Sequence, residues 1–381
     1  MITAELELPA RGSGRARAVG VAAARIWAGP VFIPWLVSRL VVSATLMVVG
    51  ARSVSDIPDY TRLVMWDGNW YRIIATSGYG LAPHAGQWST WPFFPLLPAL
   101  VWLLRQFSAP YTVALLVWSN AAAFVAFTGV HRAAGMVTTT SAARWAVWLT
   151  ALFPGAITLV MAYPDSLYLA GTVWAFVYLA RHQPARAGLA AAIAAAARPN
   201  GAIVLVALTV AAIDVSATGR GRRIALVLGP SAAFLAGWLA WLGHATGDAF
   251  VFLHAKQAWT ETSLTALISS PLRHRWGLLQ FLLGALLVLP FRRRRSRYPR
   301  SWGILAVVSL APSFAFGIVG LARYSICCFP LAIAAADHLT RRPRHGPERA
   351  TSSGPPRWPL AITAALLIAF GVLITQGSYV P

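Results

Sequence analysis

The residues best suited to chemistry stand in a chain that carries few charges. Residues 64–80, VMWDGNWYRIIATSGYG, place Asp67 beside Trp66, Trp70 and Tyr71, directly after a long apolar run. An acid among apolar residues costs free energy unless it is paired or hydrated in a cavity, and aromatic rings of these types stack on sugar faces. A helix-capping aspartate in an interfacial aromatic belt would use the same residues. This stretch alone therefore leaves a catalytic acid and a structural cap both open.

A second acid, Asp165, lies in MAYPDSLYLA between two apolar runs. Its carboxylate is suited to orienting a hydroxyl group or assisting a base. The alternative is that Asp165 caps a helix that starts near Ser166, with Pro164 ending the helix before it. Both interpretations place the acid at a helix end.

Two arginines are candidates for contact with an anion. Arg198 precedes Pro199 inside the apolar run 188–213, and a buried arginine needs an anionic partner or a hydrated cavity. Backbone amides freed by a helix break add to such a site, so a phosphate group would suit it. A structural ion pair and snorkelling to the interface are the alternatives. Arg323, followed by Tyr324 in GLARYSICCFP, leaves a phosphate contact and interface anchoring open in the same way.

The stretch FVFLHAKQAWT, residues 250–260, offers His254 and Gln257 to a carbohydrate or a pyrophosphate. A solvated amphipathic surface helix is the alternative. The sequence has no Walker loop, no GxGxxG and no H-E-x-x-H motif, so we predict no cofactor and leave a divalent metal open. The adjacent Cys327 and Cys328 are predicted to fill the core rather than to form a disulfide or metal site.

Membrane helices are the elements that must position these residues. Of the 381 residues, 57% are hydrophobic and 11% are charged, whereas a soluble domain carries about 25% charged residues. The apolar runs approach the ~20 residues that a crossing needs. Backbone polar groups in lipid must be satisfied within each helix. We therefore predict an all-α polytopic membrane protein with one transmembrane domain, residues 26–381.

The basic residues predict the orientation of the chain. The net charge is +21, but the arginines cluster between apolar runs as in cytoplasmic loops, which argues against nucleic acid as a partner. We predict a cytoplasmic tail (1–25), an extracytoplasmic loop with juxtamembrane helices (51–110), and about eleven crossings. Prolines make the run 92–104 a half-helix or a juxtamembrane helix. The break at 198–201 leaves one distorted helix open for 188–213, but the flanking charges favour a hairpin of two short helices. The cytoplasmic clusters are predicted at 131–144, 181–186, 219–223, 292–300 and 341–349.

Four stretches resemble the GT-C membrane glycosyltransferases, and among them the GPI second-mannose transferase (PIG-V-like) family and its bacterial relatives. They are WDGNWYRIIATSGYG, WPFFPLLPALVWLL, YPDSLYLAGTVWAFVYLARHQPARAGLAAAIAAAARPNG and LARYSICCFPLAIA, and the resemblance spans most of residues 30–340. It implies a bundle of transmembrane helices whose extracytoplasmic first loop carries the catalytic acid. It also implies a sugar donor on a polyprenyl phosphate, usually mannose, and transfer with inversion. The second acid position reads YPDS where the family has YTES or similar, so Asp165 stands in place of a glutamate.

These observations predict an inverting glycosyltransferase of the plasma (inner) membrane, with its N-terminus in the cytoplasm and its site outside. Asp67 would take the proton of the acceptor hydroxyl as general base, and Asp165 would assist. The acceptor is a lipid, glycan or protein, and the donor sugar could also be arabinose or glucose. The predicted phosphate ligands are Arg198 and Arg323, and the predicted substrate contacts are Trp66, Trp70, Tyr71, Tyr324, His254 and Gln257.

Two other functions stay open at this stage. A transporter or flippase for a lipid-linked sugar would also need acids and arginines in a helical bundle. Against it, the polar residues are predicted near the outer side rather than at the midplane, and no repeat symmetry is visible. A non-catalytic membrane subunit of a transferase complex is the other alternative, and it would tolerate Asp67→Asn without loss.

Overall fold

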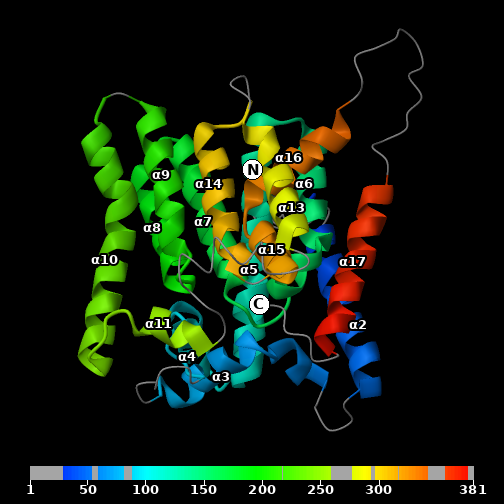
Figure 1. The fold of residues 1–381 in the computed structure, drawn as a ribbon, viewed down its shortest axis with the longest axis vertical. Helices are drawn as coiled ribbons and strands as arrows, with labels where there is room; N and C mark the ends of the chain where they lie inside the picture. Colours follow the sequence, from blue (N-terminus) through cyan, green and yellow to red (C-terminus); the bar gives the residue numbers. More distant parts are fainter. Residues whose placement is uncertain are drawn as a thin grey trace, which may run out of the picture.

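Helices make up all the regular structure in the part of the chain that a computed structural model describes (Figure 1). The described residues are 29–53, 59–80, 88–216, 218–258, 277–292, 297–315, 317–341 and 357–375. The all-helical class predicted from composition is therefore confirmed for these ranges. The predicted tail, 1–25, lies outside the described residues, and the predicted division of the chain stays a prediction.

Among the described residues, three helices are long and apolar enough to cross a membrane, namely α5 (Tyr111–Val137), α10 (Arg220–Thr246) and Phe32–Val49 of α2 (Phe32–Ser53). The other α-helices are α3 (Asp67–Ser77), α4 (Leu96–Arg105), α6 (Thr140–Leu152), α7 (Asp165–Ala180), α8 (Pro184–Ala197), α9 (Gly201–Val215), α11 (Val251–His254), α13 (Gly277–Val288), α14 (Arg300–Leu310), α15 (Gly317–Ile326), α16 (Phe329–Thr340) and α17 (Trp358–Thr375). Short 3₁₀ helices are η1 (Asp59–Val64), η2 (Pro154–Leu159), η3 (Ala255–Ala258), η4 (Leu289–Phe291) and η5 (Ala311–Ala315).

The protein is thus a helical membrane protein with several candidate spans. Shorter apolar helices accompany the three long ones, and they include α4, α8 and α9. A helix of 14 residues such as α8 is only about 21 Å long, which is less than the ~30 Å thickness of the hydrocarbon layer. Within the described ranges, the predicted count of eleven crossings is therefore not confirmed. Which end of the bundle faces the cytoplasm also stays a prediction.

The first loop lies at one end of the bundle. In Figure 1, α3, α4 and α11 lie together at the bottom, whereas the turn from α9 to α10 lies at the top. The run predicted as a half-helix at 92–104 forms the ten-residue helix α4, which begins after Pro95. Tyr79 of the loop stacks on Trp91, with ring centroids 5.3 Å apart, and its ring centroid is 5.5 Å from that of Trp238 in α10. Aromatic packing therefore fastens the loop to α10.

The predicted break at 198–201 is confirmed, since α8 and α9 form a hairpin with this break at its tip. Alanine-rich α8 has high helix propensity and starts at Pro184, a residue favoured in the first turn. The helix ends at Ala197, and Arg198 after it has extended backbone (φ −153°, ψ 151°), because the residue before a proline avoids the helical region. A Cβ on Gly201 would lie 2.1 Å from the carbonyl oxygen of Ala194, so only glycine fits where α9 begins.

The Gly201→Ala substitution is therefore expected to force α8 and α9 apart. Overpacking of this kind destabilises a protein by roughly 1–3 kcal/mol, and the shift would displace Arg198 at the hairpin tip. Thermal unfolding of the detergent-solubilised protein measures the effect. Gly237→Ala in α10 is the control, because a Cβ there has no neighbour within 4 Å. Equal midpoints for the two variants would contradict the packing argument.

Candidate functional site

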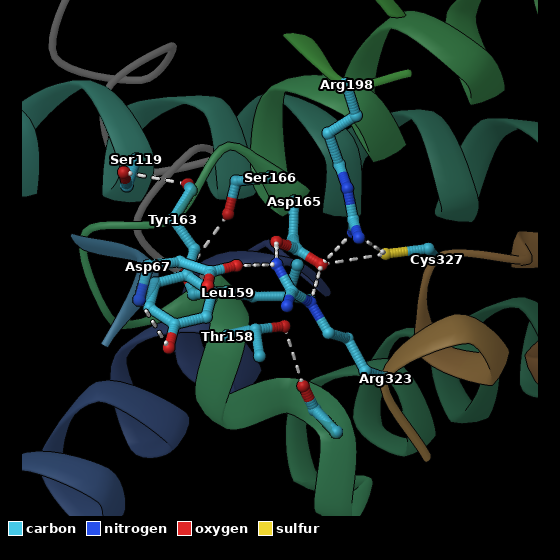
Figure 2. A network of polar contacts seen from close by, with 11 residues as sticks. Asp67, Ser119, Thr158, Leu159, Tyr163, Asp165, Ser166, Arg198, Arg323 and Cys327 are labelled. Atoms are coloured by element: carbon cyan, nitrogen blue, oxygen red, sulfur yellow. Dashed lines mark hydrogen bonds and ion pairs between the residues drawn. The ribbon is translucent and has the colours of Figure 1, made fainter. Parts of the chain in front are cut away.

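Four buried charged side chains from distant parts of the chain meet between the helices (Figure 2). Nη2 of Arg323, in α15, lies 2.8 Å from Oδ2 of Asp67 and 2.9 Å from Oδ2 of Asp165. Its Nε also donates to Oδ1 of Asp165 at 3.0 Å. Arg198 donates to the same Oδ1 through Nη1. The four residues are between 0% and 8% exposed. We call Asp67, Asp165, Arg198 and Arg323 the charge cluster.

Each acid of the charge cluster is the first residue of its helix. Asp67 begins α3 and Asp165 begins α7, where the helix dipole favours a negative charge. The N-cap residues of these helices are Trp66 and Pro164, and no side-chain capping hydrogen bond is made at either. The capping alternatives were therefore wrong. Trp66 has a φ of 58°, a left-handed conformation that is strained for a residue with a side chain and that sets the direction in which α3 starts.

Arg198 lies near two tyrosine rings. Its guanidinium carbon is 5.9 Å from the ring centroid of Tyr168 and 5.6 Å from that of Tyr324. The ion pair with Asp165 matches the structural alternative raised from the sequence, whereas snorkelling is wrong, because the Arg198 side chain is only 10% exposed. Among the described residues, Nε and Nη2 of Arg198 make no hydrogen bond. These two groups can therefore donate to a ligand.

The formal charges of the charge cluster cancel, with two carboxylates against two guanidinium groups. Buried ions are tolerated when each is paired and hydrogen-bonded. Arg323 shares its charge between both acids and is buried, so interface anchoring, the alternative raised for it, was wrong. Because its Nε and Nη2 are engaged by Asp67 and Asp165, Arg323 holds the acids in place in this structure.

Cys327 joins the charge cluster, which the sequence did not predict. Its Sγ lies 3.4 Å from Oδ1 of Asp165 and 3.9 Å from Nη1 of Arg198. The prediction that both cysteines fill the core rather than form a disulfide is confirmed, since both are free and buried, but Cys327 makes these polar contacts in addition. A cysteine in an apolar run gives no sequence signal of a polar contact, because the thiol behaves there like a small hydrophobic group.

The aromatic residues around Asp67 pack against one another. Trp70 stacks on Phe93 with centroids 5.8 Å apart, and Tyr71 meets the same ring edge-on at 5.3 Å. Burial, and after it the charge of Asp67, raises the pKa of Tyr71, so its hydroxyl stays protonated. Trp66 packs against the main core. Contact of these three residues with a substrate stays a prediction.

Among the described residues, His254 makes no hydrogen bond or ion pair with the charge cluster. His254 is exposed in α11, where its Nδ1 lies 2.6 Å from Oδ2 of Asp248. This position agrees with the surface-helix alternative. The backbone of Gln257 belongs to η3, but its side chain lies outside the described residues. Within the part of the chain that is described, no three His, Cys, Asp or Glu side chains come together to hold a metal ion.

An apolar cavity of about 710 Å³ lies between α4, α5, α7 and α8. Leu167, two residues after Asp165, contributes to its wall, as do Leu96 of α4 and Trp118 of α5. Arg186 is the single charged residue that lines it. Apolar walls of this kind favour a hydrocarbon ligand, because they offer it van der Waals packing.

Comparison with known proteins identifies the fold but no family. No protein-family profile and no curated protein matches the chain. The arabinofuranosyltransferase AftD from Mycobacteria matches with 18% identity and a TM-score of 0.50, over 94% of this chain and 27% of that one. The archaeal oligosaccharyltransferase AglB from Archaeoglobus fulgidus, solved with an inhibitory peptide and a dolichol-phosphate, matches with 14% identity and a TM-score of 0.46, over 92% of this chain and 56% of that one.

The chain therefore shares its helical fold with part of the arabinofuranosyltransferase structure over most of its own length. It spans about half the length of the oligosaccharyltransferase chain and about a quarter of the arabinofuranosyltransferase chain. The GPI second-mannose transferase family suggested by the sequence is not shown, and that resemblance stays a prediction.

Proposed function

We propose that the protein is an inverting glycosyltransferase that moves a sugar from a polyprenyl-phosphate donor to an acceptor hydroxyl, with mannose as the expected sugar. The observation that carries the proposal is the charge cluster, in which an acid of the first loop meets a second acid and two arginines. Such buried ionisable residues in a membrane protein mark functional sites. The helical fold shared with the arabinofuranosyltransferase structure supports the same conclusion.

Asp67 is assigned the role of general base. The acceptor hydroxyl is a weak nucleophile at neutral pH, so a carboxylate must accept its proton as the oxygen attacks. The oxygen forms a bond to the anomeric carbon on the face opposite the phosphate. The bond from that carbon to the phosphate oxygen breaks with its electron pair, and the polyprenyl phosphate leaves. One displacement of this kind inverts the anomeric centre, and phosphate needs no general acid to leave.

Asp165 is assigned a positioning role, because it is fully buried and bound by both arginines. It holds Arg323 against Asp67 and keeps Arg198 at the tip of the α8–α9 hairpin. Of the two predicted phosphate ligands, Arg198 is the better suited, because its Nε and Nη2 make no hydrogen bond among the described residues. Two such donors suit bidentate contact with a phosphate group.

The donor's hydrocarbon chain is assigned to the apolar cavity between α4, α5, α7 and α8. Its wall includes Leu167, close in sequence to Asp165, so a chain lying there would place its phosphate end near the charge cluster. In the membrane this chain passes from lipid into an equally apolar cavity, so van der Waals packing, rather than removal from water, favours its binding there. An acceptor lipid, glycan or protein would then approach Asp67 from outside the bundle.

A panel of labelled donors tests the proposed function. Purified protein in lipid nanodiscs would receive polyprenyl phosphate carrying radiolabelled mannose, glucose or arabinofuranose. Arabinofuranose is included because AftD is an arabinofuranosyltransferase. Label is expected to pass from mannose donor into a lipid, glycan or protein fraction. Arg198→Ala should raise the KM for the donor, whereas Arg132→Ala, an exposed position on α5, should not. Failure of every donor with the wild-type protein would overturn the proposal.

A further inference from the structure

The connection between α6 and α7 is buried although it is not α-helical. Residues 154–164 are all buried and run through η2 and an irregular segment to the start of α7. Buried backbone carbonyls in a membrane protein need hydrogen-bond partners. Within the connection, the Val160 and Met161 amides donate to the Ile157 carbonyl, and Oγ of Ser166 in α7 donates to the Leu159 carbonyl at 3.2 Å. Further partners for the Leu159 and Val160 carbonyls come from neighbouring helices.

Side chains of α2 and α5 supply these partners. Nη2 of Arg39 donates to the carbonyl oxygen of Leu159 at 2.6 Å. Nδ2 of Asn120 donates to the carbonyl oxygen of Val160 at 3.1 Å. The two side chains are joined, since Nε of Arg39 lies 2.9 Å from Oδ1 of Asn120. Arg39 and Asn120 thus hold consecutive carbonyl groups of the connection as one unit.

The connection in turn contacts both acids of the charge cluster. The backbone amide of Asp67 donates to the hydroxyl of Tyr163 at 3.4 Å, and the guanidinium carbon of Arg323 lies 4.9 Å from the Tyr163 ring (Figure 2). Ser119 of α5 holds the Tyr163 carbonyl at 3.0 Å. Asp165 follows two residues later. A shift of residues 159–163 would therefore change the approach of Asp67 to Asp165.

Arg39 is unusual because it is a charged residue inside the apolar span Phe32–Val49. A charge in a membrane helix is costly and is found where it has a role. The fork-shaped guanidinium group of Arg39 contacts Asn120 and Leu159 through two different nitrogen atoms. A lysine ammonium has one nitrogen atom and does not make both contacts in this geometry. The other contacts of Arg39 are equally neutral: the Trp35 carbonyl, the Ser38 hydroxyl, and the rings of Trp35 and Phe127.

We propose that Arg39 is a positioning residue for the charge cluster. Together with Asn120 it fixes residues 159–163, and through Tyr163 and the start of α7 it sets the distance between Asp67 and Asp165. Where catalysis is concerned, the proposal rests on the proposed function. The positional part rests on geometry alone, so it can be tested without a substrate.

Hydrogen–deuterium exchange in detergent tests the positional part. Arg39→Ala is expected to increase exchange in peptides that cover residues 155–168 and 63–71, because the Ala162 amide donates to the Leu63 carbonyl across these segments. Arg39→Lys should do the same. Arg223→Ala is the matched control, since Arg223 also donates to backbone carbonyls, those of Ala212 and Thr218, at the α9–α10 turn. Unchanged exchange in these peptides for both Arg39 variants would overturn the proposal.

Kinetics test the catalytic part. A misplacement of about 1 Å can cost roughly 10²-fold in rate, so Arg39→Ala is expected to lower kcat by that order while the donor KM stays unchanged. When it is added to Asp67→Asn, Arg39→Ala should cause no further loss of kcat. Full activity of Arg39→Lys would overturn the claim that the forked guanidinium group of Arg39 is required. If Arg39→Ala does not fold, Asn120→Ala replaces it as the test variant, because it keeps the charge of Arg39. Asn120→Ala should raise exchange in the same peptides. An inactive wild type would reject the proposed function, and the exchange result would still decide the positional part.

Discussion

Replacing Asp67 with asparagine is expected to lower the rate of sugar transfer by roughly 10²- to 10⁴-fold, the contribution of a positioned general base. The amide cannot take the proton of the acceptor hydroxyl. It has nearly the same shape, and its oxygen can still accept from Nη2 of Arg323, the group that contacts Asp67 at 2.8 Å. Arg323 also keeps its ion pair with Asp165. The variant should therefore fold and insert normally while losing activity.

Single-turnover transfer from saturating donor measures this effect without interference from product release. Asp214→Asn is the matched control, because Asp214 is an exposed acid near the end of α9 and does not belong to the charge cluster. Equal rates for Asp67→Asn and wild type would remove Asp67 as the base. Equal rates would also favour the alternative that the protein is a non-catalytic subunit of a transferase complex, because such a subunit tolerates Asp67→Asn. Movement of labelled lipid across the bilayer without transfer to an acceptor would favour the flippase.

The Arg323→Ala substitution is expected to destabilise the protein by roughly 3–5 kcal/mol, the usual loss when one partner of a buried ion pair is removed. Asp67 and Asp165 would both lose their contacts with Nη2, and Asp165 is fully buried. One guanidinium group, that of Arg198, would then remain for two buried carboxylates, and it contacts Asp165 alone of the two. Chemical unfolding of the detergent-solubilised protein measures the change.

A compensated variant separates stability from catalysis. Arg323→Gln combined with Asp67→Asn removes one charge of each sign and leaves the Arg198–Asp165 pair intact. It should recover most of the lost stability and remain inactive. Arg341→Ala is the control, because the Arg341 side chain is 52% exposed and Asp337 keeps its contacts with Arg297 and Tyr298. If Arg323→Ala lowers the free energy of unfolding by no more than Arg341→Ala does, the central role of Arg323 is contradicted.

Some of this arrangement could be predicted from the sequence, because its causes are local. Composition alone predicts a helical membrane protein, since backbone groups in lipid must pair within a helix. The hairpin between α8 and α9 follows from Pro199, which restricts the residue before it. The sequence also singles out each member of the charge cluster, because a charge in an apolar run costs free energy whatever its position in the folded protein.

The pairing of these residues was decided only by the tertiary structure. Arg323 contacts Asp67 across 256 residues and Asp165 across 158, and no local pattern links such distant positions. Cys327 gave no signal, because a thiol in an apolar run reads as a hydrophobic residue. Arg39 was missed for a similar reason. Its partners are an amide side chain and backbone carbonyls, and every sequence carries carbonyls at every position, so only the fold shows which of them need a donor.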